Sequence, residues 1–147
     1  MIHAALPGMV ARGKGAVVSF SSLLAFSAAS ENPQLPKRAL YAAGKAFLLA
    51  FFQLLAVELR GTGVKVQIVC PGIVKTEFHT RQNMDMSGRP RLEPEEVVKA
   101  SMIGLERGEV VCIPTLEEID RLQHHDQAEA EVLSAAMRPG LAQRYMT

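Results

Sequence analysis

One long apolar segment, residues 39–60, constrains the fold more than any other feature of this sequence. The sequence GTG follows it, so a helix is predicted up to that point. Phenylalanine, leucine and valine occupy nearly every direction around the axis of this helix, whereas a surface helix shows one apolar stripe. The helix is therefore expected to be buried on two sides. One side would cover a sheet, and the other would meet a partner, most simply the same helix of a second subunit.

Helices and strands alternate along the chain. Short apolar runs at 16–20, 64–70 and 109–114 are predicted strands. They lack a clean alternation of apolar and polar residues, which is typical of parallel strands covered on both faces. The pattern predicts an α/β fold with a parallel sheet and flanking helices. The predicted helices are 2–12, 39–60, 93–108 and a charged stretch from about residue 115. A proline in the first turn, acids beside it and a terminal glycine predict that helix 93–108 is capped.

The composition argues against several classes of partner. Of the 147 residues, 48% are hydrophobic and 21% are charged, which indicates one globular domain. A net charge of +1 without a basic block gives no reason to expect nucleic acid or an anionic membrane as a partner. The apolar stretch 46–57 is expected to be too short to span a bilayer, which needs about 20 residues. Cys70 and Cys112 lie far apart in the sequence, which predicts reduced thiols in a cytoplasmic protein.

Three motifs carry a resemblance to a known family. GAVVSFSS at 15–22, YAAGK at 41–45 and VCPGIVKTEF at 69–78 follow one another on a strand, a helix and a strand. In this order they resemble the short-chain dehydrogenase/reductase family. The resemblance covers residues 1–115 and only the C-terminal half of that family. It implies that the chain forms the last three strands of a doubly wound, Rossmann-type parallel sheet, with the N-terminal cofactor-binding half absent.

The motif YAAGK predicts chemistry at the start of the long helix. Tyr41 and Lys45 lie one helical turn apart, so the ammonium can approach the phenol. A free phenol with a pKa of about 10 is a poor acid or base at neutral pH, and a nearby cation favours the phenolate. The resemblance implies that Tyr41 exchanges a proton with an alcohol or carbonyl substrate. It also implies that Lys45 holds the nicotinamide ribose and that Ser22 orients the substrate oxygen.

The same resemblance implies a cofactor, NAD or NADP, and a small alcohol or carbonyl substrate. The sequence does not distinguish the two cofactors, because it contains neither a glycine-rich turn after a strand nor the residue that selects between them. The residues implied to border the nicotinamide are Pro71, Gly72, Ile73, Val74 and Thr76. The loops 22–38 and 75–92 would shape the substrate pocket with Leu23, Leu24, Phe26, Phe78, Met84 and Met86.

Some features depart from the family pattern or allow a simpler interpretation. Residues 29–38 look like a short insertion between Ser22 and Tyr41, which a loop can absorb at little entropic cost. Tyr41 could be an ordinary helix-start residue, with Lys45 extending to water. The serine pair could merely end a strand, and Pro71 with Gly72 makes a turn in any case.

Two other interpretations concern the later part of the chain and its overall function. His124, His125 and Asp126 could suggest a metal, but adjacent helical residues point in different directions, so no metal site is predicted. The alternative to an oxidoreductase is a truncated, catalytically silent module that dimerises through helix 39–60.

Overall fold

The structure is a computed structural model that describes residues 2–33, 35 and 37–146. The described residues form two compact units, one up to residue 115 and one from 116 onward. The elements of the first unit are α1 (Ile2–Ala11), β1 (Gly15–Phe20), η1 (Leu23–Phe26), α2 (Ala39–Glu58), β2 (Val64–Val69), α3 (Glu77–Thr80), α4 (Pro94–Arg107) and β3 (Val111–Cys112). The second unit contains α5 (Asp120–Ala136) and the short turn η2 (Gln143–Tyr145).

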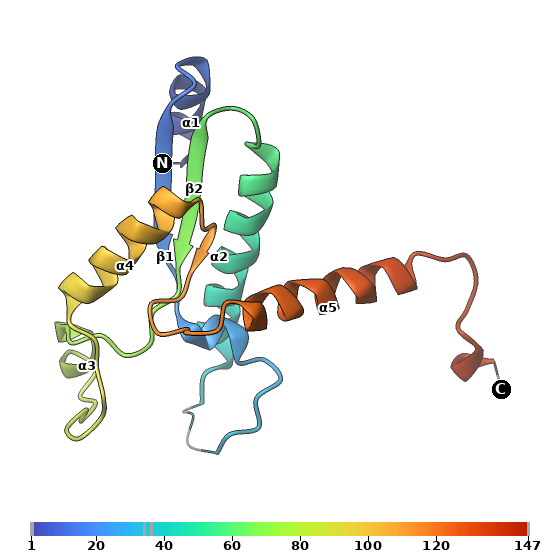
Figure 1. The fold of residues 1–147 in the computed structure, drawn as a ribbon. Helices are drawn as coiled ribbons and strands as arrows, with labels where there is room; N and C mark the ends of the chain where they lie inside the picture. The colour runs from blue at the N-terminus through green and yellow to red at the C-terminus, as the bar shows by residue number, and fades with distance from the viewer. Residues whose placement is uncertain (1, 34, 36, 147) are drawn as a thin grey trace. The chain divides into compact units, whose positions relative to one another are not determined.

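The predicted α/β fold is confirmed. The first unit has a three-stranded parallel sheet in the order β1-β2-β3, with helices packed on it (Figure 1). β1 and β2 are in register from Gly15 opposite Val64 to Phe20 opposite Val69. β2 lies in the middle and is buried at every position except Lys65, as expected for a strand covered on both faces.

β3 is much shorter than the predicted strand over 109–114. Only Val111 and Cys112 pair with β2. On the amino side, the backbone N–H of Glu109 donates to Gly104 O and so completes the end of α4. On the carboxyl side, Pro114 has no N–H to offer a neighbouring strand. The two boundaries leave room for only a short strand.

The two faces of β2 meet different helices. Val69 packs with Val97 of α4 and Cys112 of β3 in a buried cluster. Gln67 lies on the same face by the alternation of strand side chains. It accepts a hydrogen bond from Ser101 Oγ at 2.7 Å, and its amide donates to Glu109 O at 3.3 Å. α2 contacts β2 from the other side, so the sheet is covered on both faces (Figure 1).

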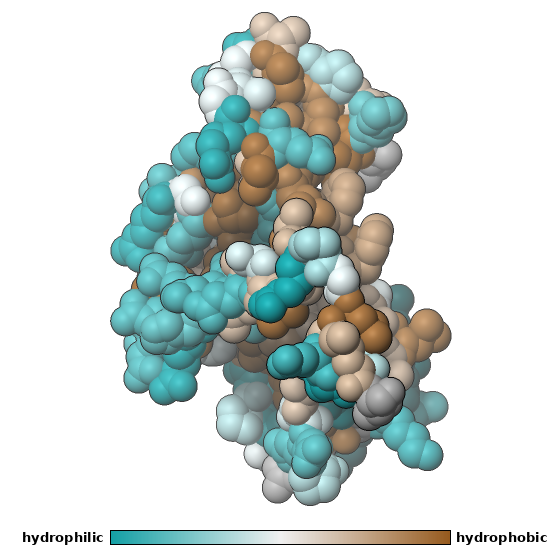
Figure 2. Space-filling model, turned by 90° about the vertical axis from the view of Figure 1, so that its right-hand side faces the viewer, coloured by the Kyte–Doolittle hydropathy of each residue, from teal (hydrophilic) through white to brown (hydrophobic). Residues whose placement is uncertain are grey.

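Helix α2 buries only part of its apolar surface within one chain. Leu49, Phe52 and Leu55 are buried, and their spacing of three residues defines one stripe that faces the sheet. The apolar residues left exposed are Leu40, Phe47, Phe51, Leu54 and Val57. Apolar residues also gather on the side of the molecule shown in Figure 2. One of the two expected buried sides of α2 is therefore present in the single chain.

The expectation that this apolar stretch is too short to span a membrane is wrong. α2 has 20 residues and a mean hydropathy of 1.8 over its most apolar window, so it is long and apolar enough to cross a membrane by length and composition. A helix in the core of a soluble protein satisfies the same test. In α2, the buried stripe packs within the chain.

Two glycine-containing turns meet at the amino ends of β1 and β2. Gly63 has a left-handed φ of 77°, and a Cβ atom added to it would overlap the carbonyl oxygen of Gly13. Gly61, two residues earlier, has a similar φ of 81°, but a Cβ there would meet no atom within 4 Å. Position 63 therefore requires glycine for two reasons, and position 61 for one.

We expect Gly63→Ala to lower the free energy of unfolding more than Gly61→Ala. The left-handed conformation alone costs roughly 1–2 kcal/mol for a residue with a side chain. The clash at Gly63 adds about 1–3 kcal/mol, because the neighbouring backbone must move. Urea unfolding of both variants followed by circular dichroism measures the difference. Equal losses would contradict the close approach of the two turns.

Candidate active site

The candidate site lies at the carboxyl ends of β1 and β2. The pairing of these strands continues past their ends, because Ser21 N donates to Val69 O at 2.7 Å and Leu23 N donates to Pro71 O at 2.9 Å. Ser22 is thereby held beside the turn that follows β2. In open parallel α/β sheets, ligands bind at this end of the strands.

Tyr41 and Lys45 project from the first turns of α2 toward the same region. Lys45 Nζ lies 5.6 Å from the centre of the Tyr41 ring, as their spacing predicts. The ammonium donates a hydrogen bond to the carbonyl of Phe20, the last residue of β1, at 3.2 Å. Tyr41 is 41% exposed, so its phenol is accessible to a ligand. The sequence prediction that the two side chains share one face is therefore met by the geometry.

The two adjacent serines have different partners. Ser21 is buried, and its hydroxyl donates to the backbone carbonyl of Lys45 at 2.8 Å, which ties the end of β1 to α2. Ser22 is partly exposed, and its Oγ accepts a hydrogen bond from the N–H of Leu24 at 3.1 Å. A serine hydroxyl that accepts one bond still has a proton to donate. Of the two serines, Ser22 is therefore the one available to a ligand.

The implied cofactor-bordering residues lie in the segment that follows β2. Pro71, Gly72, Ile73 and Val74 are partly exposed, and Val74 pairs with Leu92 in an isolated parallel bridge. The bridge has two hydrogen bonds, from Lys75 N to Leu92 O and from Leu92 N to Ile73 O, each 2.9 Å long. This pairing fixes the path of the segment as it leaves the sheet.

Thr76 is the N-cap residue of the short helix α3. It is exposed, and its Oγ1 accepts a hydrogen bond from Phe78 N at 3.4 Å. The Phe78 ring lies 6.4 Å from the ring of Tyr41, centre to centre, and is also exposed. Phe78, which sequence analysis assigned to the substrate loop, is thus brought against Tyr41.

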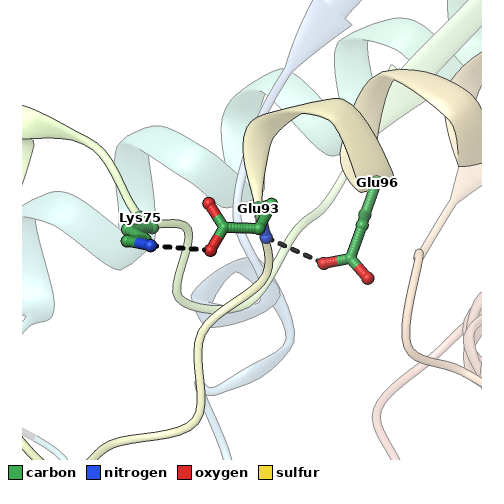
Figure 3. A network of polar contacts seen from close by, with 3 residues as sticks. All are labelled: Lys75, Glu93 and Glu96. Atoms are coloured by element: carbon green, nitrogen blue, oxygen red, sulfur yellow. Dashed lines mark hydrogen bonds and ion pairs between the residues drawn. The ribbon is translucent and has the colours of Figure 1, made fainter.

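A polar network closes the base of the loop 76–91 (Figure 3). Lys75 Nζ lies 2.8 Å from Glu93 Oε1, while Glu93 N donates to Glu96 Oε2 at 2.8 Å in a capping box that begins α4. The sequence predicts the capped helix but not the ion pair. Nothing in the local sequence indicates that Lys75 would meet a residue 18 positions away.

An open hollow lies beside Tyr41. Its lining is mostly apolar and comes from the η1 turn and the start of α2, namely Leu24, Ala25, Ser27, Ala28, Lys37, Arg38, Ala39, Leu40, Tyr41, Ala42, Ala43 and Ala46. Another hollow lies at the opposite, amino end of the strands, near Gly63 and Gly108. The candidate residues Ser22, Tyr41 and Lys45 do not line it, so we assign no ligand to it.

Cys70 and Cys112 are buried thiols on opposite faces of the sheet. Cys112 lies opposite Val69 in the strand register, and Cys70 is the next residue, so its side chain points to the other face. Burial raises the pKa of the Cys70 thiol from 9.0 to about 11, although hydrogen bonding to Ser21 opposes the shift. Burial, followed by the charge of Glu109, also raises the pKa of Cys112. The expectation of free thiols agrees with this geometry.

The raised pKa of the Cys70 thiol predicts how the free energy of unfolding changes at alkaline pH. Because its pKa is raised in the folded chain, the unfolded state loses its proton first, and the free energy of unfolding falls between pH about 9 and about 11. The loss is on the order of 2 kcal/mol. Urea unfolding at several pH values measures it. Cys70→Ala should remove this contribution from the pH dependence, and an unchanged slope in that variant would contradict the assignment.

Among residues 2–33, 35 and 37–146, no group of three or more histidine, cysteine, aspartate or glutamate side chains is arranged to hold a metal ion. His125, at the suspected cluster, lies 3.4 Å from Asp126 and 3.7 Å from Glu129 through its two ring nitrogens. These are contacts along one exposed helix.

Comparison with known families agrees with the fold and the motifs. A family model described as short chain dehydrogenase matches residues 1–87. An uncharacterized oxidoreductase of Myxococcus xanthus is 39% identical over 108 residues, which are 74% of this chain and 40% of that protein. The chain belongs to the short-chain dehydrogenase family.

Solved structures extend the similarity to nearly the whole chain. A short-chain dehydrogenase from Sphingobium yanoikuyae in complex with NADPH is 34% identical with a TM-score of 0.85, covering 97% of this chain and 54% of that one. A bulky-bulky ketone specific alcohol dehydrogenase from Comamonas testosteroni is 30% identical with a TM-score of 0.81, covering 99% and 53%. The chain thus spans about half the length of these solved relatives and 40% of the curated one.

Proposed function

We propose that this chain carries the proton-transfer and substrate-orienting part of an NAD(P)-dependent oxidoreductase that interconverts an alcohol and a carbonyl. The observation that carries the proposal is the approach of the Lys45 ammonium to the exposed Tyr41 ring at the carboxyl end of β1. Family membership and the NADPH held by the Sphingobium relative support it. A catalytically silent module would not need this arrangement.

The residues present fit a nicotinamide dinucleotide by the chemistry of their donors. A lysine ammonium has three N–H donors. Lys45 donates one of them to Phe20 O, and the others can bind the hydroxyls of a ribose. The partly exposed segment 71–74 lies at the same end of the sheet and could border a nicotinamide ring. When bound, the dinucleotide would supply or accept the hydride.

Four residues of the site then have distinct roles in the proposed reaction. The Tyr41 phenol gives a proton to the oxygen of a carbonyl substrate, or takes one from an alcohol. Lys45 places its positive charge beside the Tyr41 ring and donates to the ribose of the dinucleotide. Ser22 donates its hydroxyl proton to the substrate oxygen, while its Oγ is held by the hydrogen bond that it accepts from Leu24 N–H. Phe78, next to Tyr41, forms an apolar wall against the rest of the substrate.

The catalytic proposal is tested in an active protein in which this chain is joined to the part of the Sphingobium dehydrogenase that it does not span. Tyr41→Phe keeps the ring but removes the proton donor, so turnover should fall by at least about 10²-fold. Ser22→Ala should mainly lower turnover. Lys45→Ala should also raise KM for the dinucleotide, because donors to the ribose are lost. Steady-state kinetics with both substrates varied measures these effects.

The matched control is Tyr145→Phe, which changes the other of the two tyrosines of the chain. Tyr145 lies in the second unit and is exposed, so its loss should leave turnover unchanged. Turnover of Tyr41→Phe within about twofold of the parent would show that the proton does not pass through Tyr41.

We also propose that the exposed apolar face of α2 associates with a second copy of the chain, in a protein that resides in the cytoplasm. Phe47 and Phe51 stack with ring centres 6.2 Å apart on this face, and Leu54 continues it. Covering such side chains stabilises an interface by roughly 25 cal/mol per Å² of apolar surface. A symmetric dimer would bring the same face of both subunits together.

We expect sedimentation of the 147-residue chain to show dimers or larger species at micromolar concentrations. Leu54→Glu should shift it toward monomer, because a charge would be buried in the contact. The matched control is Val98→Glu on α4, where the apolar side chain is 54% exposed compared with 64% for Leu54. A parent chain that sediments as a monomer would contradict the proposed interface.

A further inference from the structure

Arg38 joins two parts of the site that are distant in sequence. It occupies the N-cap position of α2, three residues before Tyr41, but makes no side-chain capping bond. Its side chain instead reaches back across the loop. Nε donates to Ser27 Oγ at 3.0 Å, and Nη2 donates to the carbonyls of Ser27 at 3.0 Å and Ser30 at 2.9 Å. The guanidinium thus fastens the turn after η1 to the first residues of α2.

The hydrogen bonds continue from this turn to Ser22. Ser27 Oγ donates to Leu24 O at 2.7 Å, and Ser27 N donates to the same carbonyl at 3.2 Å. Leu24 N in turn donates to Ser22 Oγ at 3.1 Å. Ser22 and Ser27 are the two caps of η1. A continuous set of contacts therefore links Arg38, next to Tyr41, with the Oγ atom of Ser22.

We propose that Arg38 is a positioning residue for the reaction, which sets the place of Ser22 Oγ relative to the Tyr41 phenol. The inference rests on the proposed function. Ser22 is fixed to the sheet through its neighbours, but its hydroxyl is directed by the η1 turn, and Arg38 holds that turn. Its hydrogen bonds to Ser27 and Ser30 hold the turn that directs Ser22, so Arg38 acts through the turn.

The chemistry of arginine suits this role better than that of lysine. A planar guanidinium presents five N–H donors in a fixed geometry, and here one group donates to Ser27 Oγ and to the carbonyls of both Ser27 and Ser30. A lysine ammonium at the same position could reach one or two of them without fixing their mutual orientation. A misplacement of about 1 Å can lower a rate by about 10²-fold. Arg38 variants are therefore expected to lose turnover without losing the fold.

The test uses Arg38→Ala and Arg38→Lys, with Lys99→Ala as the matched control. Lys99 is an exposed cation on α4 that does not line the hollow beside Tyr41. In the active protein described above, Arg38→Ala should lower turnover by about 10- to 100-fold, with little change in KM for the dinucleotide. Arg38→Lys should recover only part of the loss, and Lys99→Ala should have no effect on turnover. Added guanidinium ion should partly restore Arg38→Ala and should not affect the parent.

Hydrogen exchange of the 147-residue chain supplies a second readout that needs no activity. The amides of Leu24 and Ser27 should exchange faster in Arg38→Ala, while those of β2 remain protected. Ser27→Ala removes one acceptor without changing the charge of α2, and should produce a smaller change of the same kind. This variant keeps the test decisive if Arg38→Ala does not fold.

The outcomes separate this inference from the proposed function. If Tyr41→Phe abolishes turnover but Arg38→Ala leaves it within about twofold, Arg38 does not position the site and only this inference fails. If Arg38→Lys restores full turnover, the positive charge matters rather than the geometry of the hydrogen bonds, which also overturns it. If Tyr41→Phe has no effect, the proposed function itself fails.

Discussion

The parallel pairing of β1 with β2 is the interaction on which the candidate site depends. The register brings the end of β1 beside the end of β2, and two further hydrogen bonds extend the alignment to Ser21 and Leu23. A slip of one residue would turn every side chain of β1 to the other face. Ser21 could then no longer reach the carbonyl of Lys45 on α2. The sheet therefore positions the helix as well as the strand ends.

Helix α2 meets two requirements with different parts of its surface. Its buried stripe holds the helix against β2, and its first turns present Tyr41 and Lys45 at the carboxyl end of the sheet. The Lys45 ammonium also donates a hydrogen bond to Phe20 O. This bond ties the start of α2, which carries the proposed proton donor Tyr41, to the end of β1. The other apolar face is left for an additional contact. The composition that made α2 resemble a membrane span reflects apolar residues on both its buried stripe and its exposed face.

Local sequence was informative wherever a backbone period or a short motif decides the structure. The apolar run predicted α2, the turn residues after it predicted its end, and the proline with adjacent acids predicted the capped start of α4. The sequence prediction was least accurate for β3, because a short apolar run does not reveal that Glu109 completes a helix and that Pro114 cannot pair. The stretch 46–57 considered as a membrane candidate was also too short, since residues 39–45 of the same predicted helix belong to the apolar span.

The sequence by itself determined the α/β order of elements and the shared face of Tyr41 and Lys45, because a helix repeats every 3.6 residues whatever surrounds it. Only the tertiary structure decided which serine of the pair is accessible, that Cys70 and Cys112 face away from each other, and that Arg38 reaches Ser27. These contacts depend on strand register and on how a loop closes over a helix end. Both are set by the packing of residues far apart in the chain, and no local period encodes them.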